Sequence, residues 1–187
     1  MTIAKDVKIQ VELNPAEVEA YRLIGYENRM LAAQDFNDDT KDAGEIGAGH
    51  TVTALYETVR VGGAADLPTV DPLKYETQTV MTGAAESGEL MTVKLRYKQP
   101  DGDVSKLIGV AAFDEGLTLE DSSDDFAFAA AVASFGMLLR GSEHAEALTY
   151  DLVTELAGTA LGDGPFGYRA EFVDLVAKAQ AIKTGSP

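Results

Sequence analysis

The acidic segment at residues 35–45 holds the residues whose types and spacing come nearest to a known chemistry. It reads DFNDDTKDAGE, and Asp35, Asn37 and Asp39 alternate like the first ligands of an EF-hand calcium loop. The match then fails, because Thr40 stands where that loop needs glycine and Ile46 stands where it needs glutamate. This mismatch favours a solvated loop between two strands, and we expect no metal there.

An irregular calcium site is the alternative, since calcium accepts loose cages of oxygen ligands. The candidate ligands are the carboxylate and amide side chains of the acidic segment, namely Asp35, Asn37, Asp38, Asp39, Asp42 and Glu45. A calcium titration would separate this alternative from the solvated loop.

The glycines and histidines give no recognisable nucleotide-binding or catalytic motif. His50 follows Gly44, Gly47 and Gly49, but their spacing differs from G-x-G-x-x-G, and a strand rather than a helix is expected next. We interpret this segment as a tight turn at the start of a strand. His144 is the other histidine, and the chain has neither cysteine nor an H-E-x-x-H motif for zinc. With no G-x-S-x-G elbow or P-loop either, we predict a non-enzymatic chain without a cofactor.

A compact polar and aromatic cluster follows the second expected strand. Tyr26, Glu27 and Arg29 stand almost side by side in the sequence, and together with His50 they form a candidate interaction patch. The simpler interpretation is that Arg29 pairs with a local carboxylate while Tyr26 packs against the fold.

Composition restricts the partners that this chain can take. Its 187 residues include 31 acidic and 15 basic ones, which gives a formal net charge of -16. A field of this sign repels phosphate backbones and anionic lipids, so we expect neither nucleic acid nor membrane surfaces as partners. No run reaches the roughly 18 apolar residues of a spanning helix. The first residues show no apolar signal-peptide core, and we expect no signal peptide in this chain.

The elements that must position these residues change type along the chain. Alternation of Val7, Ile9, Val11 and Leu13 with polar residues predicts a strand with one buried face. Further strands are expected at 21–26, 51–59, 90–98 and 106–113, the last two joined as a hairpin by the turn sequence QPDGD. A short helix at 15–20 and a short strand at 73–80, within a long connection, are additional interpretations.

Helical patterns begin after residue 120. Capping residues and 3.6-residue periodicity predict helices at 124–140, 150–161 and 168–182, and the first of these is apolar on all sides, which is typical of a buried helix. We therefore predict an α+β fold, in which an antiparallel β-sandwich or sheet over residues 5–118 is followed by three helices packed on it. The expected parts are residues 1–120 and 121–187, sharing one core.

Several long phrases of the chain together resemble one family. They are TIAKDVKIQVELNP, YRLIGYENR, DFNDDTKDAGEIGAGHTVTALYE, LRYKQPDGD and GYRAEFVDLV. In this order they are similar to the domain of unknown function in the C-terminal region of bacterial proteins that carry a von Willebrand factor type A (vWA) domain. The similarity covers nearly the whole chain and is loose only at about residues 61–89.

The resemblance implies an accessory domain in a longer protein. Its partner would be the adjacent vWA domain, and its location the bacterial periplasm or cell envelope. The magnesium site of that family, a D-x-S-x-S cluster, belongs to the vWA domain and is absent here, so it is not carried over. The implied role is structural and protein-interacting, and the first strands, at residues 7–13, are expected to accept strands that precede the vWA domain.

Overall fold

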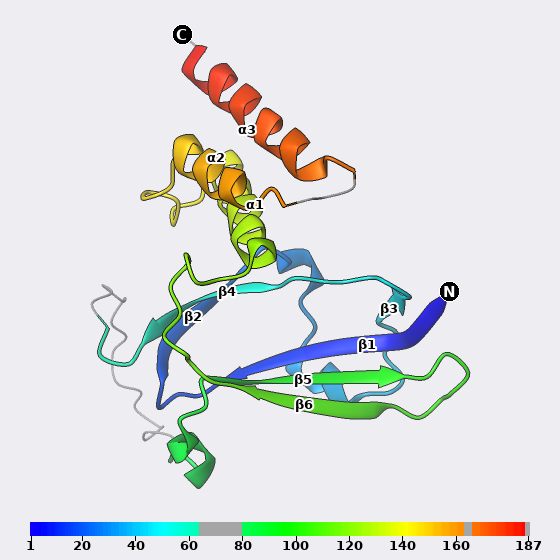
Figure 1. Cartoon of the computed structure of the whole chain (residues 1–187). Helices are drawn as coiled ribbons and strands as arrows, with labels where there is room; N and C mark the ends of the chain where they lie inside the picture. Colours follow the sequence, from blue (N-terminus) through cyan, green and yellow to red (C-terminus); the bar gives the residue numbers. More distant parts are fainter. Residues whose placement is uncertain (64–79, 163–165, 186–187) are drawn as a thin grey trace. The chain divides into compact units, whose positions relative to one another are not determined.

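A computed structural model describes residues 1–63, 80–162 and 166–185 (Figure 1). The chain divides into two compact units, Met1–Glu115 with the described strands and Gly116–Pro187 with the described α-helices. The predicted α+β fold, with antiparallel sheets followed by three helices that pack together, is confirmed. A core shared by the two parts stays a prediction.

The first unit is built on a four-stranded antiparallel sheet in the order β3-β1-β5-β6. Its strands are β3 (Gly44–Gly47), β1 (Thr2–Leu13), β5 (Met91–Lys98) and β6 (Lys106–Ala112), and Figure 1 shows β1, β5 and β6 side by side. The β5–β6 hairpin forms as predicted, because alternating apolar residues flank a turn rich in proline, aspartate and glycine.

The register of β1, β5 and β6 separates their side chains onto two different faces. Ile9, Leu95 and Ile108 lie in one row across the three strands, and Val11, Val93 and Val110 lie in the next row on the same side. We call this the apolar face; Leu13, Met91 and Ala112 complete it. Side chains alternate along a strand, so the residues between these positions form the opposite face. We call it the polar face, and its β1 and β5 members are Lys8, Gln10, Glu12, Thr92, Lys94 and Arg96.

A second, two-stranded sheet pairs β2 (Val18–Ile24) with β4 (Leu55–Arg60) in antiparallel fashion. Cross-strand ion pairs join its strands, since Arg22 contacts Glu57 and Arg60 contacts Glu17 beside β2. Val18, at the start of β2, is buried with 6% of its surface exposed. Figure 1 shows β2 and β4 as a ribbon separate from the larger sheet.

The described connections of the first unit contain three short 3-10 helices. They are η1 (Glu27–Arg29), η2 (Ala33–Asn37) and η3 (Gly83–Ser87). The η2 helix brings Phe36 into a buried position at 5% exposure. Asn14 ties the end of β1 to the η3 segment, because its side-chain amide donates to the carbonyls of Ala85 and Glu89 at 3.0 and 2.8 Å.

The second unit consists of α1 (Asp124–Arg140), α2 (Tyr150–Thr159) and α3 (Tyr168–Gly185). Their starts follow the predicted caps, and the hydroxyls of Ser123 and Thr149 accept the first free backbone N–H groups of α1 and α2. The helices enclose a small apolar cluster of their own, formed by Ala131, Phe135, Val153, Ala157 and Val176.

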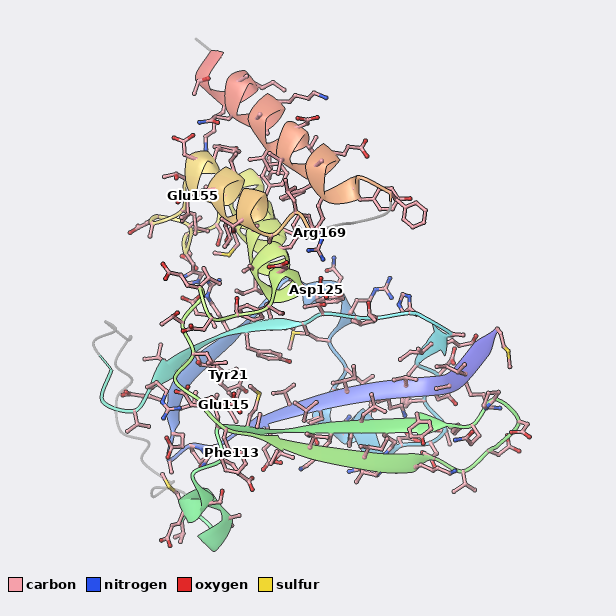
Figure 2. All side chains as sticks on the ribbon, in the orientation of Figure 1. Tyr21, Phe113, Glu115, Asp125, Glu155 and Arg169 are labelled. Carbon is pink, nitrogen blue, oxygen red and sulfur yellow. The ribbon has the colours of Figure 1, made fainter. Side chains whose placement is uncertain are left out.

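One ion pair fastens the beginning of α3 to the beginning of α1. The guanidinium of Arg169 contacts the carboxylate of Asp125, and Figure 2 shows the two residues close together. The same guanidinium donates to the carbonyl of Ala160 at 2.7 Å and lies over the ring of Phe128 at 4.8 Å. Among the described residues, no helix is both long enough and apolar enough to cross a membrane.

The structure corrects several local expectations. A helix at 15–20 is wrong, because residues 15–17 turn and β2 begins at Val18. The strand expected at 51–59 begins only at Leu55. The segment 44–47, expected in a loop, is strand β3. The strand expected at 73–80 lies outside the described residues except for Val80, which is in no strand.

Two burial expectations also change. The alternation in the first strand predicted that Ile9 faces a core and Lys8 faces solvent, yet Ile9 is 52% exposed and Lys8 only 3%. Lys8 is buried because the loop that contains Asp35 and Asp38 covers this part of the polar face. In α1, Phe126 and Leu139 are exposed while Phe135 and Met137 are buried.

Candidate functional site

Lys8 is the buried cation at the centre of the polar face. Its ammonium donates to the backbone carbonyl of Asp35 at 3.2 Å and to the backbone carbonyl of Asp38. Both acceptors belong to the acidic loop, residues 35–45, which lies 27 to 30 positions away in the sequence. A buried ammonium needs such partners, since leaving it without hydrogen bonds costs several kcal/mol. Lys8 therefore holds the loop against the sheet.

Two further cations of β5 hold the same loop. Arg96 donates to the side-chain oxygen of Asn37 at 2.9 Å and to the hydroxyl of Ser105 at 2.8 Å, and its guanidinium lies 5.5 Å from the centre of the Phe36 ring. Lys98 donates to the backbone carbonyl of Asp39 at 2.9 Å. Since Arg96 and Lys98 are two positions apart on one strand, they reach the loop from the same side of the sheet.

Asp6 and Lys98 form a well shielded ion pair in the described part of the first unit. Their side chains lie 2.8 Å apart and are 19% and 12% exposed. The hydrogen bond from Lys98 is the main reason why the pKa of Asp6 lies below its ordinary value, and the same bond raises the pKa of Lys98. Asp6 has a left-handed backbone, with φ of 51°, which aims its carboxylate at Lys98 and at the backbone N–H of Ala43.

Carboxylates of the acidic loop are themselves engaged in hydrogen bonds. The Asp38 carboxylate accepts both the backbone N–H and the hydroxyl of Thr40, at 2.9 and 2.6 Å, and these bonds lower the pKa of Asp38. A hydrogen bond from the side chain of Ser105 is the main cause that lowers the pKa of Asp39. The stabilised form of each group is therefore the ionised one.

These contacts show where the candidate calcium ligands lie. The side-chain oxygen of Asn37 accepts from Arg96, and Asp35 has Lys41 at 4.0 Å. The side chain of Glu45, now in β3, accepts from Thr2 at 3.2 Å. In the part of the chain that the structure describes, no three histidine, aspartate or glutamate side chains converge as they would around a metal. Calcium binding by the loop stays an untested alternative. In this structure, the positive groups that contact the loop carbonyls are the ammonium groups of Lys8 and Lys98.

The predicted interaction patch is brought together only in part. Tyr26 and Arg29 share the η1 turn, where the backbone N–H of Arg29 donates to the carbonyl of Tyr26 at 2.8 Å. Tyr26 is 47% exposed and has a left-handed backbone. The side chain of Glu27 lies outside the described part. His50 is exposed in the turn after β3, and across the described ranges no hydrogen bond or ion pair joins it to η1. The patch stays a prediction.

The apolar face is the larger feature that sequence reasoning missed. None of its nine side chains is buried, and Ile9, Ile108 and Val110 are 52%, 47% and 59% exposed. Soluble proteins seldom leave a contiguous apolar surface open unless it meets a partner. The sequence signal was available in the alternation of β1, β5 and β6, but that alternation alone says only that one face is apolar and not that it stays uncovered.

The polar face and the apolar face can do different things chemically. On the first, the ammonium groups of Lys8 and Lys98 donate to loop carbonyls and to the Asp6 carboxylate, and the Arg96 guanidinium donates to Asn37 and Ser105. The buried Nε of Arg96 has no hydrogen-bond partner within the described residues. The second offers apolar surface for association with another protein surface, and its side chains carry no polar group that could act in catalysis.

A cavity of about 450 Å³ is lined by Asn14, Met81, Met91 and neighbouring residues and is widely open. Two of its lining side chains, Lys94 and Glu12, pair with each other at 2.5 Å.

Comparison with known proteins identifies a family and a relative that match nearly the whole chain. A family model described as "Uncharacterized protein YfbK, C-terminal" matches residues 1–182. A protein of Escherichia coli (strain K12), "Uncharacterized protein YfbK", is 41% identical over 182 residues, which is 97% of this chain and 31% of the relative. The chain thus spans less than a third of that relative. No solved structure matches the chain.

Proposed function

Because the chain belongs to the family of YfbK C-terminal domains, we propose that it is a non-enzymatic protein-interaction domain. In this proposal it supports and orients a neighbouring vWA domain within a longer protein of the bacterial cell envelope. The chain covers only 31% of its E. coli relative, which leaves more than twice its length for other domains. The vWA assignment and the envelope location rest on the sequence resemblance.

The ionisable groups support a non-enzymatic role. General acid catalysis by a carboxyl group needs a pKa raised toward the working pH. The described carboxyls with shifted pKa values, Asp6, Asp38, Asp39 and Asp121, all have a lowered pKa, each mainly because a lysine or hydroxyl side chain donates a hydrogen bond to it. Lowered pKa values of this origin are typical of structural contacts.

The open apolar face is the observation that carries the proposal. Ile9 on β1 and Ile108 and Val110 on β6 lie on the two strands that flank β5, with about half of each side chain exposed. On the opposite face, the acidic loop contacts β1 through Lys8 and β5 through Arg96. Burial of apolar area is the main driving force of protein association. A face of this kind in a domain that occupies a minor share of a longer protein is suited to contact the remaining part.

Association of the two parts as separate chains tests the proposal. Residues 1–187 and the remaining part of the intact protein are mixed, and their affinity is measured by isothermal titration calorimetry. We expect binding, and we expect Ile108→Lys to weaken it by at least about tenfold because the charge enters the apolar face. Leu107→Lys is the matched control, since Leu107 is 54% exposed on the opposite face of the same strand.

The outcomes decide the proposal as follows. Preserved melting temperatures of both variants establish that the isolated chain still folds, which is expected for exposed positions. Absence of binding between the unmodified parts contradicts the proposed function. Equal loss of affinity in Ile108→Lys and Leu107→Lys would show that the apolar face is not the contact surface.

A further inference from the structure

The two edges of the four-stranded sheet are built differently. The β3 edge is four residues long, includes Glu45, and pairs with β1 through two register shifts. Short length, a charge and irregular pairing are the features by which sheets prevent further strands from adding. The β6 edge has seven residues, pairs with β5 without a register shift, and contains one charged residue, Lys106. Within the described ranges, the β3 edge therefore carries these protective features and the β6 edge lacks most of them.

The β6 strand also belongs to the open apolar face. Every residue from Lys106 to Ala111 is exposed, and Ile108 and Val110 are the members of that face that lie on the outer strand. Among the described strands, β6 pairs with β5 alone. In an antiparallel strand with one neighbour, alternate backbone N–H and C=O groups point away from that neighbour. An added strand would satisfy those groups, and its apolar side chains would extend the apolar face.

We propose that β6 accepts a β-strand from the remaining part of the same polypeptide, and that alternate apolar residues of this strand continue the apolar face. This inference rests on the proposed function and names the contact through which it acts. It also corrects the strand at which another strand is expected to add. The sequence predicted addition at the first strand, but that strand, β1, lies inside the sheet between β3 and β5.

Two observations select this occupant over a second copy of the chain. Each copy carries a formal net charge of -16, so two copies repel each other over their whole surfaces. A segment of the same polypeptide is tethered, which gives it an effective concentration in the millimolar range for short flexible linkers. The E. coli relative has 69% of its length outside the region matched by this chain, from which such a strand can come. The strand is expected to be neutral or basic.

Residue-resolved hydrogen exchange tests the inference in the intact protein and in the isolated chain. The amides of Leu107–Ala112 that point away from β5 should exchange fast in the isolated chain and at least about tenfold more slowly in the intact protein. The amides of β3, at Gly44–Gly47, are the matched control, because they lie on the protected edge and should exchange at equal rates in both samples.

Each other outcome overturns the inference. Unchanged β6 rates in an intact protein that still loses its interdomain contact with Ile108→Lys would show docking on the face without strand pairing, and the proposed function would survive. Unchanged rates together with no association of the separate parts would contradict both. Slowing of β6 exchange in the isolated chain as its concentration rises would assign the edge to a second copy.

Discussion

The two faces of the four-stranded sheet differ in what their side chains contact. On the polar face, Lys8, Arg96 and Lys98 are matched by carbonyl and side-chain oxygens of the acidic loop. On the apolar face, the described residues leave all nine side chains at least partly exposed. Buried charges need partners of fixed geometry within the same chain, whereas apolar side chains can be covered by any surface of suitable shape. We therefore propose that the domain covers the Lys8 and Arg96 part of one face itself, and that the other face is available for association.

The largest effect is expected where the loop is packed into the fold. Phe36→Ala should lower the free energy of unfolding by about 3–4 kcal/mol, because the ring is 5% exposed and lies against Arg96. Phe113→Ala should change it by less than about 1 kcal/mol, because that ring, at the end of β6 (Figure 2), is 58% exposed. Urea denaturation of the 187-residue chain measures both. Equal losses would show that the loop does not close the polar face.

Removing the buried ammonium should have the next largest effect. Lys8→Met keeps much of the side-chain volume but leaves the carbonyls of Asp35 and Asp38 without their donor, at a cost of about 2–3 kcal/mol. Lys94→Met is the control, since Lys94 forms an exposed pair with Glu12 and should cost at most about 1 kcal/mol. The same denaturation experiment compares them. A Lys8→Met variant as stable as Lys94→Met contradicts the account of Lys8.

The Asp6–Lys98 pair should give the loop a defined dependence on pH. The pKa of folded Asp6 lies below its ordinary value of 3.8, so its contribution is present above that pH and is lost as pH falls through the folded pKa. The pKa of folded Lys98 lies above 10.5, so its contribution is present below that pH and is lost as pH rises through the raised value. Stability from the pair should therefore be constant between these limits.

Asp6→Asn tests this dependence, because asparagine tolerates the left-handed backbone found at this position. We expect the variant to lose about 1 kcal/mol near neutral pH and to approach the original chain as the pH falls through the lowered pKa of Asp6. Urea denaturation across this range measures the difference. A difference that stays constant into acid would mean that the pair does not stabilise the loop.

The smallest effect is expected from calcium. Millimolar calcium should leave the melting temperature unchanged, because Lys8 and Lys98 already occupy loop carbonyls that an irregular oxygen cage would need. Magnesium at the same concentration is the control for ionic strength. A rise with calcium and not with magnesium would support the calcium alternative and would require the ammonium groups to move.

Local chemistry made most of the elements predictable. The β5–β6 hairpin and the helices capped by Ser123 and Thr149 depend on neighbouring residues, so their bounds were predicted to within a few positions. The order within the acidic loop depends on Lys8 and Arg96, which are 27 and 59 residues from their loop partners. No local sequence pattern indicates such long-range contacts. For this reason the strand β3 and the 3-10 helix η2 were not predicted.

The candidate site was predictable only in part, for a related reason. Asp35, Asn37 and Asp39 indicate a need for positive charge, but the cations that meet it lie on other strands, so reasoning within the loop led to calcium as an alternative. Alternation in β1, β5 and β6 indicates an apolar face. Whether that face is covered depends on how distant segments pack, and the sequence pattern does not show this. Ile9 is therefore exposed, although its position in the alternation predicted that it faces a core.

Hydroxyl-radical footprinting of the isolated chain and of the intact protein tests the central claim most directly, because it compares the two faces in one experiment. We predict that Phe36 is protected in both samples, and that Ile9, Ile108 and Val110 are oxidised in the isolated chain but protected in the intact protein. Oxidation of Ile108 and Val110 at the same rate in both samples would contradict the claim that the apolar face is kept for the rest of the protein.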